Sequence, residues 1–465
     1  MAKAKPQPPK GTRDRLPEEL RKRHYVVEVI REVFQRYGFE PLETPAIERL
    51  ETLSGKYGEE GDQLMFKVLR RGQPLVDGVR RAAQHLAEPG AVLEGRSGET
   101  APGAEPLLAD LGLRYDLTVP LARVIAAHQG KLPTVFKRYQ IQPVWRADTP
   151  GRGRFREFYQ CDVDVVGSTS EVVEAEVCAA ASECLDRLGF REFALRINHR
   201  ALLRALIETA RIAPERETDA LVAIDKLDKV GRDGVVQELR SRGIDADSAA
   251  RLITLLGEDP SLSRIHEQLR DHAGGAQAVA QIEAVQQLCA GTIAEKYMRF
   301  DATLARGLGY YTGCIFEVTV PDLAGSLGGG GRYDGLIGMF SGKDVPACGF
   351  SLGLERILVV MDEQNMYPET LGRPDVAVAP IKENDLPAAF RLAQRLRGEG
   401  LKVDLRPKAF KPGKLRQYAE QQAISSVVWL EVGATDKASL WRQGEDATER
   451  DVPLELVADY LRSKR

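Results

Sequence analysis

The sequence predicts an α+β protein of several parts, and three observations lead to this class. A strand, an arginine-rich loop and a returning strand occupy residues 145–166, which is the pattern of a hairpin. Residues 201–300 are almost wholly helical by pattern. From residue 371 onward, short apolar strands alternate with helices, which indicates a small α/β domain with a mainly parallel sheet.

Length and composition limit the classes of protein that this chain can belong to. Its 465 residues suggest two or three domains, and its net charge of −3 excludes a uniformly basic nucleic-acid-binding protein. Six cysteines without a Cys-x-x-Cys pair indicate neither a disulfide framework nor a zinc site, and we expect no metal held by the protein alone. No 18-residue apolar stretch occurs, so we expect a cytoplasmic protein without a membrane partner.

The first expected element is a helix over 18–37 that should pack on a sheet. Its apolar face carries Val26, Val27, Ile30, Val33 and Phe34. Residues 71–105 are rich in Gly, Ala, Pro, Arg and Glu, which predicts a surface insertion with a short helix near 79–87. After a strand that ends near 197–200, helical segments are separated by breakers such as Gly257 and Pro260.

The C-terminal region begins at a break near Pro374 and carries a modest basic excess. The expected strands and helices lie over 376–379, 386–398, 402–405, 414–422 and 425–430. Residues 371–465 hold 17 basic and 14 acidic side chains. The segment 406–416 is the best candidate in this region for contacting phosphate, through Lys411, Lys414 and Arg416, with a solvated loop as the alternative interpretation.

The hairpin loop carries four arginines within eleven positions. They are Arg146, Arg152, Arg154 and Arg156. Proline and glycine between them indicate a loop, whereas the acids Asp162 and Asp164 are confined to the outgoing strand. Because side chains alternate along a strand, these two acids share one face of the sheet. A solvated basic surface remains the alternative interpretation.

A second candidate site is the segment 305–313, in which Arg306 lies in a turn rich in glycine and tyrosine. The planar guanidinium of arginine suits phosphate or carboxylate, and Tyr310 and Tyr311 combine apolar faces with hydroxyl groups. This pattern indicates an anionic group held beside an aromatic wall. The alternative is a strand that ends in a polar hairpin, since Tyr-Thr-Gly is also ordinary turn chemistry.

A third candidate is the glycine run 328–331, followed by the segment 348–358 with a helix that carries Glu355 and Arg356. Backbone amides of such a run can bind phosphate, but the Gly-Lys-Ser/Thr of a P-loop and the spaced glycines of a dinucleotide fold are both missing. Alternatively, the glycines form a flexible connection without a function. The arginine on the helix is then a solvated or ion-paired surface residue.

In their order along the chain, these motifs resemble those of class II aminoacyl-tRNA synthetases, and within that class the histidyl-tRNA synthetase family. Residues 38–45 are similar to the first class motif, a dimer-interface helix and strand that ends at a proline. The arginine hairpin is similar to motif two and 349–356 to motif three, while 306–313 and 328–336 resemble two signatures of the histidine enzymes. Residues 9–14 and 113–120 are also similar to this family.

The resemblance implies a homodimer with an antiparallel catalytic sheet of six or more strands flanked by helices. A helical insertion interrupts this class II domain, and an anticodon-binding-type α/β domain follows it. We therefore expect the catalytic domain over 1–200 and 296–370, and the insertion over 201–295, where it can reach the tRNA acceptor arm. The anticodon-binding-type domain is expected over 371–465.

The resemblance also implies the activity: activation of L-histidine with ATP and Mg²⁺, and transfer of the histidyl group to the 3′ end of tRNA(His). Arg146 then contacts the α-phosphate, Arg154 and Arg356 engage the distal phosphates, and Arg306 acts with Arg146 in catalysis. The implied histidine-binding residues are Asp116, Thr118, Gln160, Asp164, Arg306, Tyr310 and Tyr311. The end of the tRNA is expected near Thr149 and Arg152.

Two departures from the family pattern keep a second function open. The family usually carries aspartate where this chain has Gly309, and the sequence after residue 430 follows the family only loosely. The alternative is a synthetase-like paralogue that serves as a regulatory or binding subunit, for example of ATP phosphoribosyltransferase. Such relatives commonly lose the ATP arginines and the C-terminal domain, both of which this chain keeps.

Overall fold

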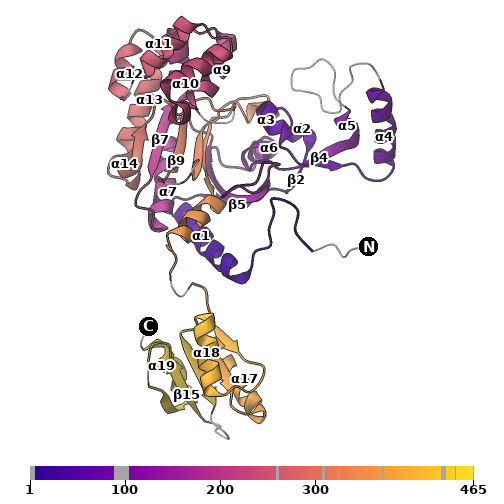
Figure 1. Ribbon diagram of the computed structural model, residues 1–465, viewed down its shortest axis with the longest axis vertical. Helices are drawn as coiled ribbons and strands as arrows, with labels where there is room; N and C mark the ends of the chain where they lie inside the picture. The colour runs from indigo at the N-terminus through magenta and orange to yellow at the C-terminus, as the bar shows by residue number, and fades with distance from the viewer. Residues whose placement is uncertain are drawn as a thin grey trace. The chain divides into compact units, whose positions relative to one another are not determined.

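The computed structural model of the protein forms two compact units, Met1–Met366 and Tyr367–Arg465 (Figure 1). The residues that it describes are 6–87, 104–257, 261–305, 309–321, 323, 325–368, 371–430, 436–445 and 447–463. Over these residues, the helices are too short or too polar to cross a membrane.

An eight-stranded, largely antiparallel sheet forms the centre of the first unit. In spatial order its strands are β1 (Glu40–Pro41), β5 (Phe136–Trp145), β6 (Glu157–Val166), β11 (Ala347–Gly353), β10 (Gly328–Arg332), β9 (Cys314–Thr319), β7 (Ala194–His199) and β8 (Met298–Phe300). Only the outermost pairs, β1 with β5 and β7 with β8, are parallel. The expected antiparallel sheet of six or more strands is therefore confirmed.

Long helices cover this sheet, as the hydrophobic pattern predicted. They are α1 (Pro17–Arg36), α7 (Val172–Arg187) and α16 (Leu354–Glu363). The buried face of α1 includes Val26, Ile30, Val33 and Phe34, which confirms the expected helix. Each buried aliphatic side chain of this kind stabilises the fold by about 1.5–3 kcal/mol.

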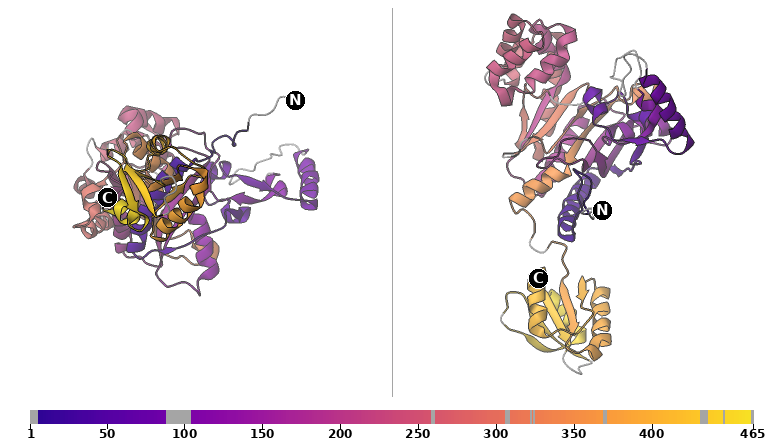
Figure 2. Two further views of the ribbon diagram at one scale, coloured as in Figure 1. Left: turned by 90° about the horizontal axis from the view of Figure 1, so that it is seen from below. Right: turned by 45° about the vertical axis from the view of Figure 1, so that its right-hand side comes forward.

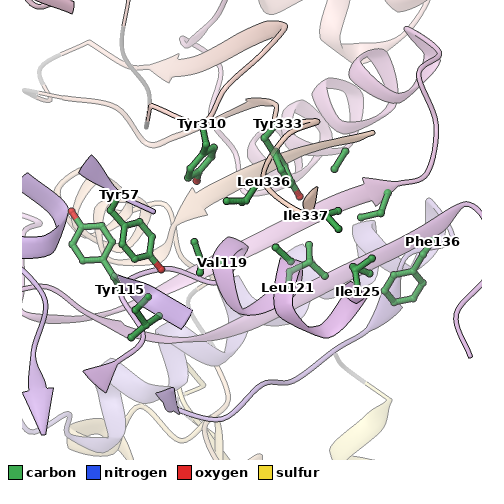
Figure 3. Close-up of a cluster of buried hydrophobic side chains, with 14 of the residues drawn as sticks. Tyr57, Tyr115, Val119, Leu121, Ile125, Phe136, Tyr310, Tyr333, Leu336 and Ile337 are labelled. Carbon is green, nitrogen blue, oxygen red and sulfur yellow. The ribbon is translucent and has the colours of Figure 1, made fainter. Parts of the chain in front are cut away.

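A second apolar cluster lies where α6 (Thr118–His128) packs on the sheet (Figure 3). Tyr57 and Tyr115 lie at one end of it, and Tyr310 and Tyr333 approach it from later parts of the chain. Two short helices contribute side chains to it, α2 (Leu50–Leu53) and α15 (Gly338–Ser341), and α3 (Gly58–Gln63) follows Tyr57 in the chain. The cluster thus brings segments that are distant in the sequence to one place beside the sheet.

The insertion at 71–105 belongs to an arm that extends from the first unit (Figures 1 and 2). The arm consists of β2 (Ile47–Arg49), β3 (Lys67–Leu69), β4 (Ala109–Leu113), α4 (Gln73–Leu86) and α5 (Glu105–Leu108). The helix expected at 79–87 begins earlier, at Gln73, because Gly72 adopts φ +65° and Pro74 stands in the first turn. Residues 88–103 of the insertion lie outside the described residues.

The helical prediction for 201–300 is confirmed over the described part of that segment. It contains α8 (Arg200–Thr209), α9 (Glu217–Ile224), α10 (Leu227–Ser241), α11 (Ala246–Leu256), α12 (Leu262–Gln268), α13 (Ala273–Cys289) and α14 (Ile293–Tyr297). Gly257 ends α11 at φ +65°, as expected of a breaker. These helices gather on the side of the unit away from the arm (Figure 2).

The glycine run 328–331 is neither filler nor a phosphate loop but strand β10, between β9 and β11. Side chains would clash there: a Cβ on Gly330 would lie 2.1 Å from the carbonyl oxygen of Gly349, and a Cβ on Gly331 2.5 Å from that of Cys314. Close approach of neighbouring backbones therefore explains the glycines. The sequence could not show this, because the neighbouring strands lie elsewhere in the chain.

The second unit contains a five-stranded sheet flanked by helices. Its strands are, in spatial order, β13 (Val403–Leu405), β12 (Val376–Pro380), β14 (Ser426–Leu430), β15 (Lys437–Arg442) and β16 (Glu449–Pro453). The helices are α17 (Leu386–Gly398), α18 (Pro412–Gln422) and α19 (Val457–Arg462). The three expected strands β13, β12 and β14 are parallel as predicted, whereas β15 and β16, which were not expected, pair antiparallel and make the whole sheet mixed. The connections before them are too short for the crossover that parallel strands need.

Candidate active site

A cavity of about 380 Å³ opens over the middle of the large sheet. The predicted site residues on its wall are Asp116, Thr118, Arg146, Arg154, Gln160, Tyr310, Tyr311 and Arg356. They come from α6 and the turn before it, the β5–β6 hairpin, the segment before β9, and α16. The structure thus brings most of the separately predicted residues into one site.

The basic loop between β5 and β6 closes one side of this cavity. Gly151 and Arg154 pair through two backbone hydrogen bonds of 3.0 Å, which give the loop its tight end. Gly153, at φ +66°, lies so near α16 that a Cβ there would stand 3.1 Å from Cγ of Arg356. The glycine lets the loop and the helix arginine approach each other.

Arg146 is held at the base of this loop between two aromatic rings. Its Nε donates to the carbonyl oxygen of Tyr115 at 3.0 Å. Its guanidinium carbon lies 4.2 Å from the ring centroid of Tyr115 and 5.2 Å from that of Phe158. Stacking fixes the plane of the guanidinium, which suits it to bind a phosphate in one orientation.

Arg154 and Arg356 contribute two further cations to the same end of the cavity. The side chain of Arg154 is 55 % exposed, with Asp148 3.9 Å away. Nη1 of Arg356 donates to the carbonyl oxygen of Ser326 at 2.5 Å. Three arginines around one end of a cavity create a strongly positive site for an anion of high charge.

Asp116 supplies a buried carboxylate to the wall. Its Oδ1 accepts hydrogen bonds from the hydroxyl of Tyr57 at 3.0 Å and from the backbone N–H groups of Thr118 and Val119 at 3.2 and 3.0 Å. Burial raises the pKa of Asp116 above its ordinary value, although these hydrogen bonds and the charge of Arg146 oppose the rise. The hydroxyl of Tyr310 stands 3.5 Å from Oδ2. The carboxylate is therefore placed to accept a cationic donor from a ligand.

Gln160 adds an acceptor that the protein leaves unused. Its Nε2 donates to the hydroxyl of Ser351 at 2.9 Å, which fixes the amide. Its Oε1 is buried and has no hydrogen-bond partner among the described residues. A buried acceptor without a partner is costly, so a ligand donor at this point would be favoured.

Tyr310 and Tyr311 form the aromatic part of the wall. Their rings meet edge to face at 5.1 Å, and burial raises the pKa of both hydroxyls, so they remain protonated donors. Arg306, predicted from the same segment, lies outside the described residues. Gly309 is exposed, and a Cβ there would meet nothing within 4 Å, so the position has room for the aspartate that the family usually carries.

Asp164 does not reach the wall of the main cavity. It lines a small pocket of about 20 Å³ beside it, together with Thr118, Tyr311 and Asp162. Arg138 lies 2.7 Å from Asp164 and 3.8 Å from Asp162, and the hydroxyl of Tyr333 donates to Asp164. Here two buried carboxylates share one arginine. Burial, opposed by Arg138, raises the pKa of Asp162 to about 7.

This pair leads to a prediction on stability. The folded protein keeps a proton on Asp162 at pH values where the unfolded chain, with an aspartate pKa near 4, has lost it. Stability therefore falls as pH rises from about 4 to about 7. Asp162→Asn removes this titration. The free energy of unfolding of the variant minus that of the unsubstituted protein should therefore be about 1–2 kcal/mol more positive at pH 8.5 than at pH 5.5. Urea denaturation at the two pH values measures this, and equal changes would contradict it.

The residues predicted to contact tRNA lie at the surface. Thr149 is exposed, and Arg152 pairs with Glu363, with Nε 3.0 Å from the carboxylate. Lys411 and Lys414 are exposed in the second unit. Arg416 instead packs against Trp429 and Trp441, 5.4 Å from each ring centroid, and donates to Thr448. Those contacts favour a structural role for Arg416 over contact with phosphate.

Several residues of the cavity were not assigned a role from the sequence. They are Asp148, Phe155, Phe158, Glu317, Ser351 and Glu355. Phe158 shares a strand face with Gln160, so the alternation along β6 could have identified it. Glu317 and Ser351 come from β9 and β11, and they reach the site only because these strands lie in the same sheet.

A cavity on an antiparallel sheet, lined by arginines together with acidic and aromatic groups, is the arrangement of class II aminoacyl-tRNA synthetases. The family model described as histidyl-tRNA synthetase matches residues 11–79 and 108–357. The chain belongs to this family. The match leaves out 80–107, where the second half of α4 lies, and the C-terminal unit.

Known relatives match nearly the full length of the chain. A histidine–tRNA ligase of Gloeobacter violaceus is 40% identical, with 97% of this chain and 98% of the relative covered. A histidine–tRNA ligase of Porphyromonas gingivalis is 41% identical, with 94% of this chain and 93% of the relative covered. The crystal structure of histidyl-tRNA synthetase from Nostoc sp. PCC 7120 matches over 100% of both chains, with a TM-score of 0.79 and 29% identity. The fold is shared with a structure from Bacillus halodurans C described as an ATP phosphoribosyltransferase regulatory subunit/histidyl-tRNA synthetase. Its TM-score is 0.70 at 23% identity, with 92% of this chain and 98% of that chain covered.

Proposed function

We propose that the chain is a histidine–tRNA ligase, which joins L-histidine to ATP as histidyl-adenylate and then transfers the histidyl group to the 3′ end of tRNA(His). One observation carries this proposal: Arg146, Arg154 and Arg356 share a single cavity with Asp116 and Gln160. A triphosphate and the ammonium group of an amino acid thus find opposite charges within one site. Relatives named histidine–tRNA ligase, at about 40% identity over nearly the full chain, agree with it.

Charge neutralisation is the main work of the first step. The carboxylate of histidine attacks the α-phosphate of ATP while pyrophosphate leaves, so anionic groups must approach one another. Arg146 lies nearest the acidic end, since its charge acts on Asp116, and this position suits the α-phosphate. Arg154 and Arg356 then hold the distal phosphates and the leaving pyrophosphate.

Selection of histidine falls to the other end of the cavity. The carboxylate of Asp116 and the unused Oε1 of Gln160 receive the ammonium group. Tyr310 and Tyr311 border the imidazole. A site that hydrogen-bonds a polar ring strongly rejects apolar analogues, because these leave buried polar groups without partners. Asp164 acts from beneath the cavity, through its pairing with Arg138.

Two further participants follow from the family. Arg306 acts with Arg146 at the reacting carboxylate and α-phosphate. Mg²⁺ neutralises phosphate charge when bound, and it usually takes one or two carboxylates together with substrate phosphates. No cluster of three or more acidic, histidine or cysteine side chains among the described residues could hold it without ATP. We assign Glu317 on the cavity wall as its carboxylate, although Oε1 of Glu317 also lies 3.5 Å from Nη1 of Arg196. Both oxygens of Glu355, on the same wall, accept hydrogen bonds from protein donors.

The parts of the chain divide the remaining tasks. The catalytic domain spans 1–200 and 296–370, and it pairs with a second copy through the region around 38–45 to form a homodimer. The insertion 201–295 approaches the acceptor arm of the tRNA, whose end lies near Thr149 and Arg152. The domain 371–465 binds the anticodon, with Lys411 and Lys414 on phosphates. The six cysteines are free and buried, which fits the reducing cytoplasm.

The experiment that tests the proposal is histidine-dependent exchange of labelled pyrophosphate into ATP by the purified protein. We expect exchange with histidine and none with other amino acids. Charging of tRNA(His) with labelled histidine then tests the second step. A folded dimer without exchange would overturn the proposal and favour a regulatory paralogue, with Gly309 as the first residue to restore to aspartate.

A further inference from the structure

One sequence motif has so far no part in the site: the segment Pro9 to Arg15. The structure places it along the outer side of the basic loop. The carbonyl oxygen of Gly11 accepts a hydrogen bond of 2.8 Å from the backbone N–H of Arg156, on the returning side of that loop. A turn in which Thr12 donates to the carbonyl oxygen of Pro9, at 3.0 Å from its backbone nitrogen and 2.7 Å from its hydroxyl, shapes the segment for this contact.

The contact between the segment and the loop is close. Gly11 has φ +83°, and a Cβ there would lie 2.7 Å from Cγ of Arg156 and 3.0 Å from Cγ of Pro150. Two residues further on, the guanidinium of Arg13 lies 4.4 Å from the ring centroid of Phe155, which lines the cavity. Only a residue without a side chain permits this packing, and the arginine adds a cation–π contact to it.

The same segment is joined to the helix that carries Arg356. Nη2 of Arg15 donates to Oε1 of Glu355 at 2.8 Å, and Glu355 is almost fully buried on the cavity wall. The other carboxylate oxygen, Oε2, accepts from the backbone N–H of Tyr159 at 2.8 Å, at the start of β6. Arg23 of α1 also pairs with Glu355 and stacks 4.3 Å from the Tyr159 ring.

From these contacts we propose that Pro9 to Arg15 is a strap that holds the basic loop against α16 in the conformation that binds the triphosphate. Arg13 and Arg15 are its positioning residues: they act through Phe155 and Glu355 and do not themselves line the cavity. The inference rests on the proposed function for the identity of the ligand, but the strap itself is a property of the free protein. Losing it lets Arg146, Arg154 and Arg356 move relative to one another, so the strap affects ATP more than histidine.

Deuterium uptake by the free protein tests the strap without any assumption about activity. The variants are Arg13→Ala and Gly11→Ala, each of which loosens the contact with the loop. We expect faster uptake in peptides that cover 146–159, because the N–H groups of Arg156 and Tyr159 lose protection. The rest of the catalytic unit should exchange as in the unsubstituted protein. Arg31→Ala is a matched control, since Arg31 pairs with Glu28 on the surface of α1, 2.5 Å apart. Gly400→Ala is the second, because Gly400 has φ +86° with nothing within 4 Å of an added Cβ.

Kinetics of pyrophosphate exchange provide the second measurement. We expect Arg13→Ala to raise KM for ATP about two- to fivefold, the range of a cation–π contact at a partly exposed site. For Gly11→Ala, backbone strain and the clash with Arg156 should raise it about tenfold. KM for histidine should change by less than about twofold in both. Arg13→Lys keeps a cation over the ring and should recover most of the loss.

The outcomes separate the strap from the proposed function. Faster uptake over 146–159 with a selective rise in KM for ATP supports the strap. Unchanged uptake and unchanged KM in both variants overturn it, as does an equal rise in KM for ATP and histidine together with lower thermal stability. If the unsubstituted protein shows no histidine-dependent exchange, the proposed function fails, and the uptake measurement alone still decides on the strap.

Discussion

Arg146→Ala should lower kcat for histidine-dependent pyrophosphate exchange about 100- to 1,000-fold, the effect of removing one preorganised charge from a transition state. The structure explains the size of this effect. A hydrogen bond to Tyr115 and two aromatic rings hold the guanidinium in place, so its charge needs no rearrangement when the phosphate charge shifts. Exchange kinetics at saturating ATP and histidine measure kcat directly.

A lysine at the same position distinguishes charge from shape. Arg146→Lys keeps the charge but loses the planar donor pair and its stacking, so we expect kcat between those of the alanine variant and the unsubstituted protein. Arg70→Ala is the control, because Arg70 pairs with Asp110 at 3.0 Å on the arm. If kcat of Arg146→Ala falls by less than about threefold, the loss is far smaller than expected. Arg146 would then have no catalytic role.

Asp116→Asn should raise KM for histidine about 10- to 100-fold, which corresponds to the loss of a hydrogen bond between charged groups. The asparagine oxygen can still accept from Tyr57, Thr118 and Val119, so the turn before α6 keeps its hydrogen bonds. The substitution therefore removes the charge and replaces Oδ2, the acceptor that faces the Tyr310 hydroxyl, with an NH2 donor. KM for ATP should change by less than about threefold.

The matched control is Asp110→Asn on the arm, which removes the carboxylate of the surface pair with Arg70. Such exposed pairs contribute about 0.2–1 kcal/mol, so we expect neither KM to respond. Equal increases in the KM values for ATP and histidine in Asp116→Asn would indicate a general distortion of the cavity instead of a lost ammonium site. A KM for histidine like that of the control would contradict the proposed role of Asp116.

The two ends of the cavity are not independent. Arg146 lowers the pKa of Asp116 through its charge, so Arg146→Ala should make that carboxyl group easier to protonate. At acidic pH, Arg146→Ala should therefore also weaken histidine binding, because more of the Asp116 carboxyl group is protonated. The double substitution should cost less than the sum of the two single losses, as expected for groups that share one site.

Much of the fold could be predicted from the sequence, since it follows from local patterns. The apolar spacing in α1, the basic hairpin of β5 and β6, and the helices after residue 200 were all evident before the structure. The residues predicted to bind ATP or histidine, other than Arg306 and Asp164, line one cavity wall. Arginines, acids and tyrosines in glycine-rich turns are informative because they are poor material for a core.

Other features depend on neighbours that are distant in the sequence. The glycine run has the composition of a loop, but it forms strand β10. Glycine is needed there because the backbones of β9 and β11 lie too close to leave room for side chains. Asp164 was predicted to bind histidine, but it pairs with Arg138 and Tyr333 and lines the small pocket beside the main cavity. Arg416 was predicted to contact phosphate, but it packs against two tryptophan rings.

The sequence by itself determined the family, the α+β class and most of the residues around the cavity, because residue type and local spacing carry that information. Only the tertiary structure decided which of the charged residues are free to meet a ligand and which pair with the protein. It also showed that the segment from Pro9 to Arg15 contacts the basic loop and Glu355. The physical reason is that pairing and burial depend on distances through space, and these are set by the packing of strands and helices far apart along the chain.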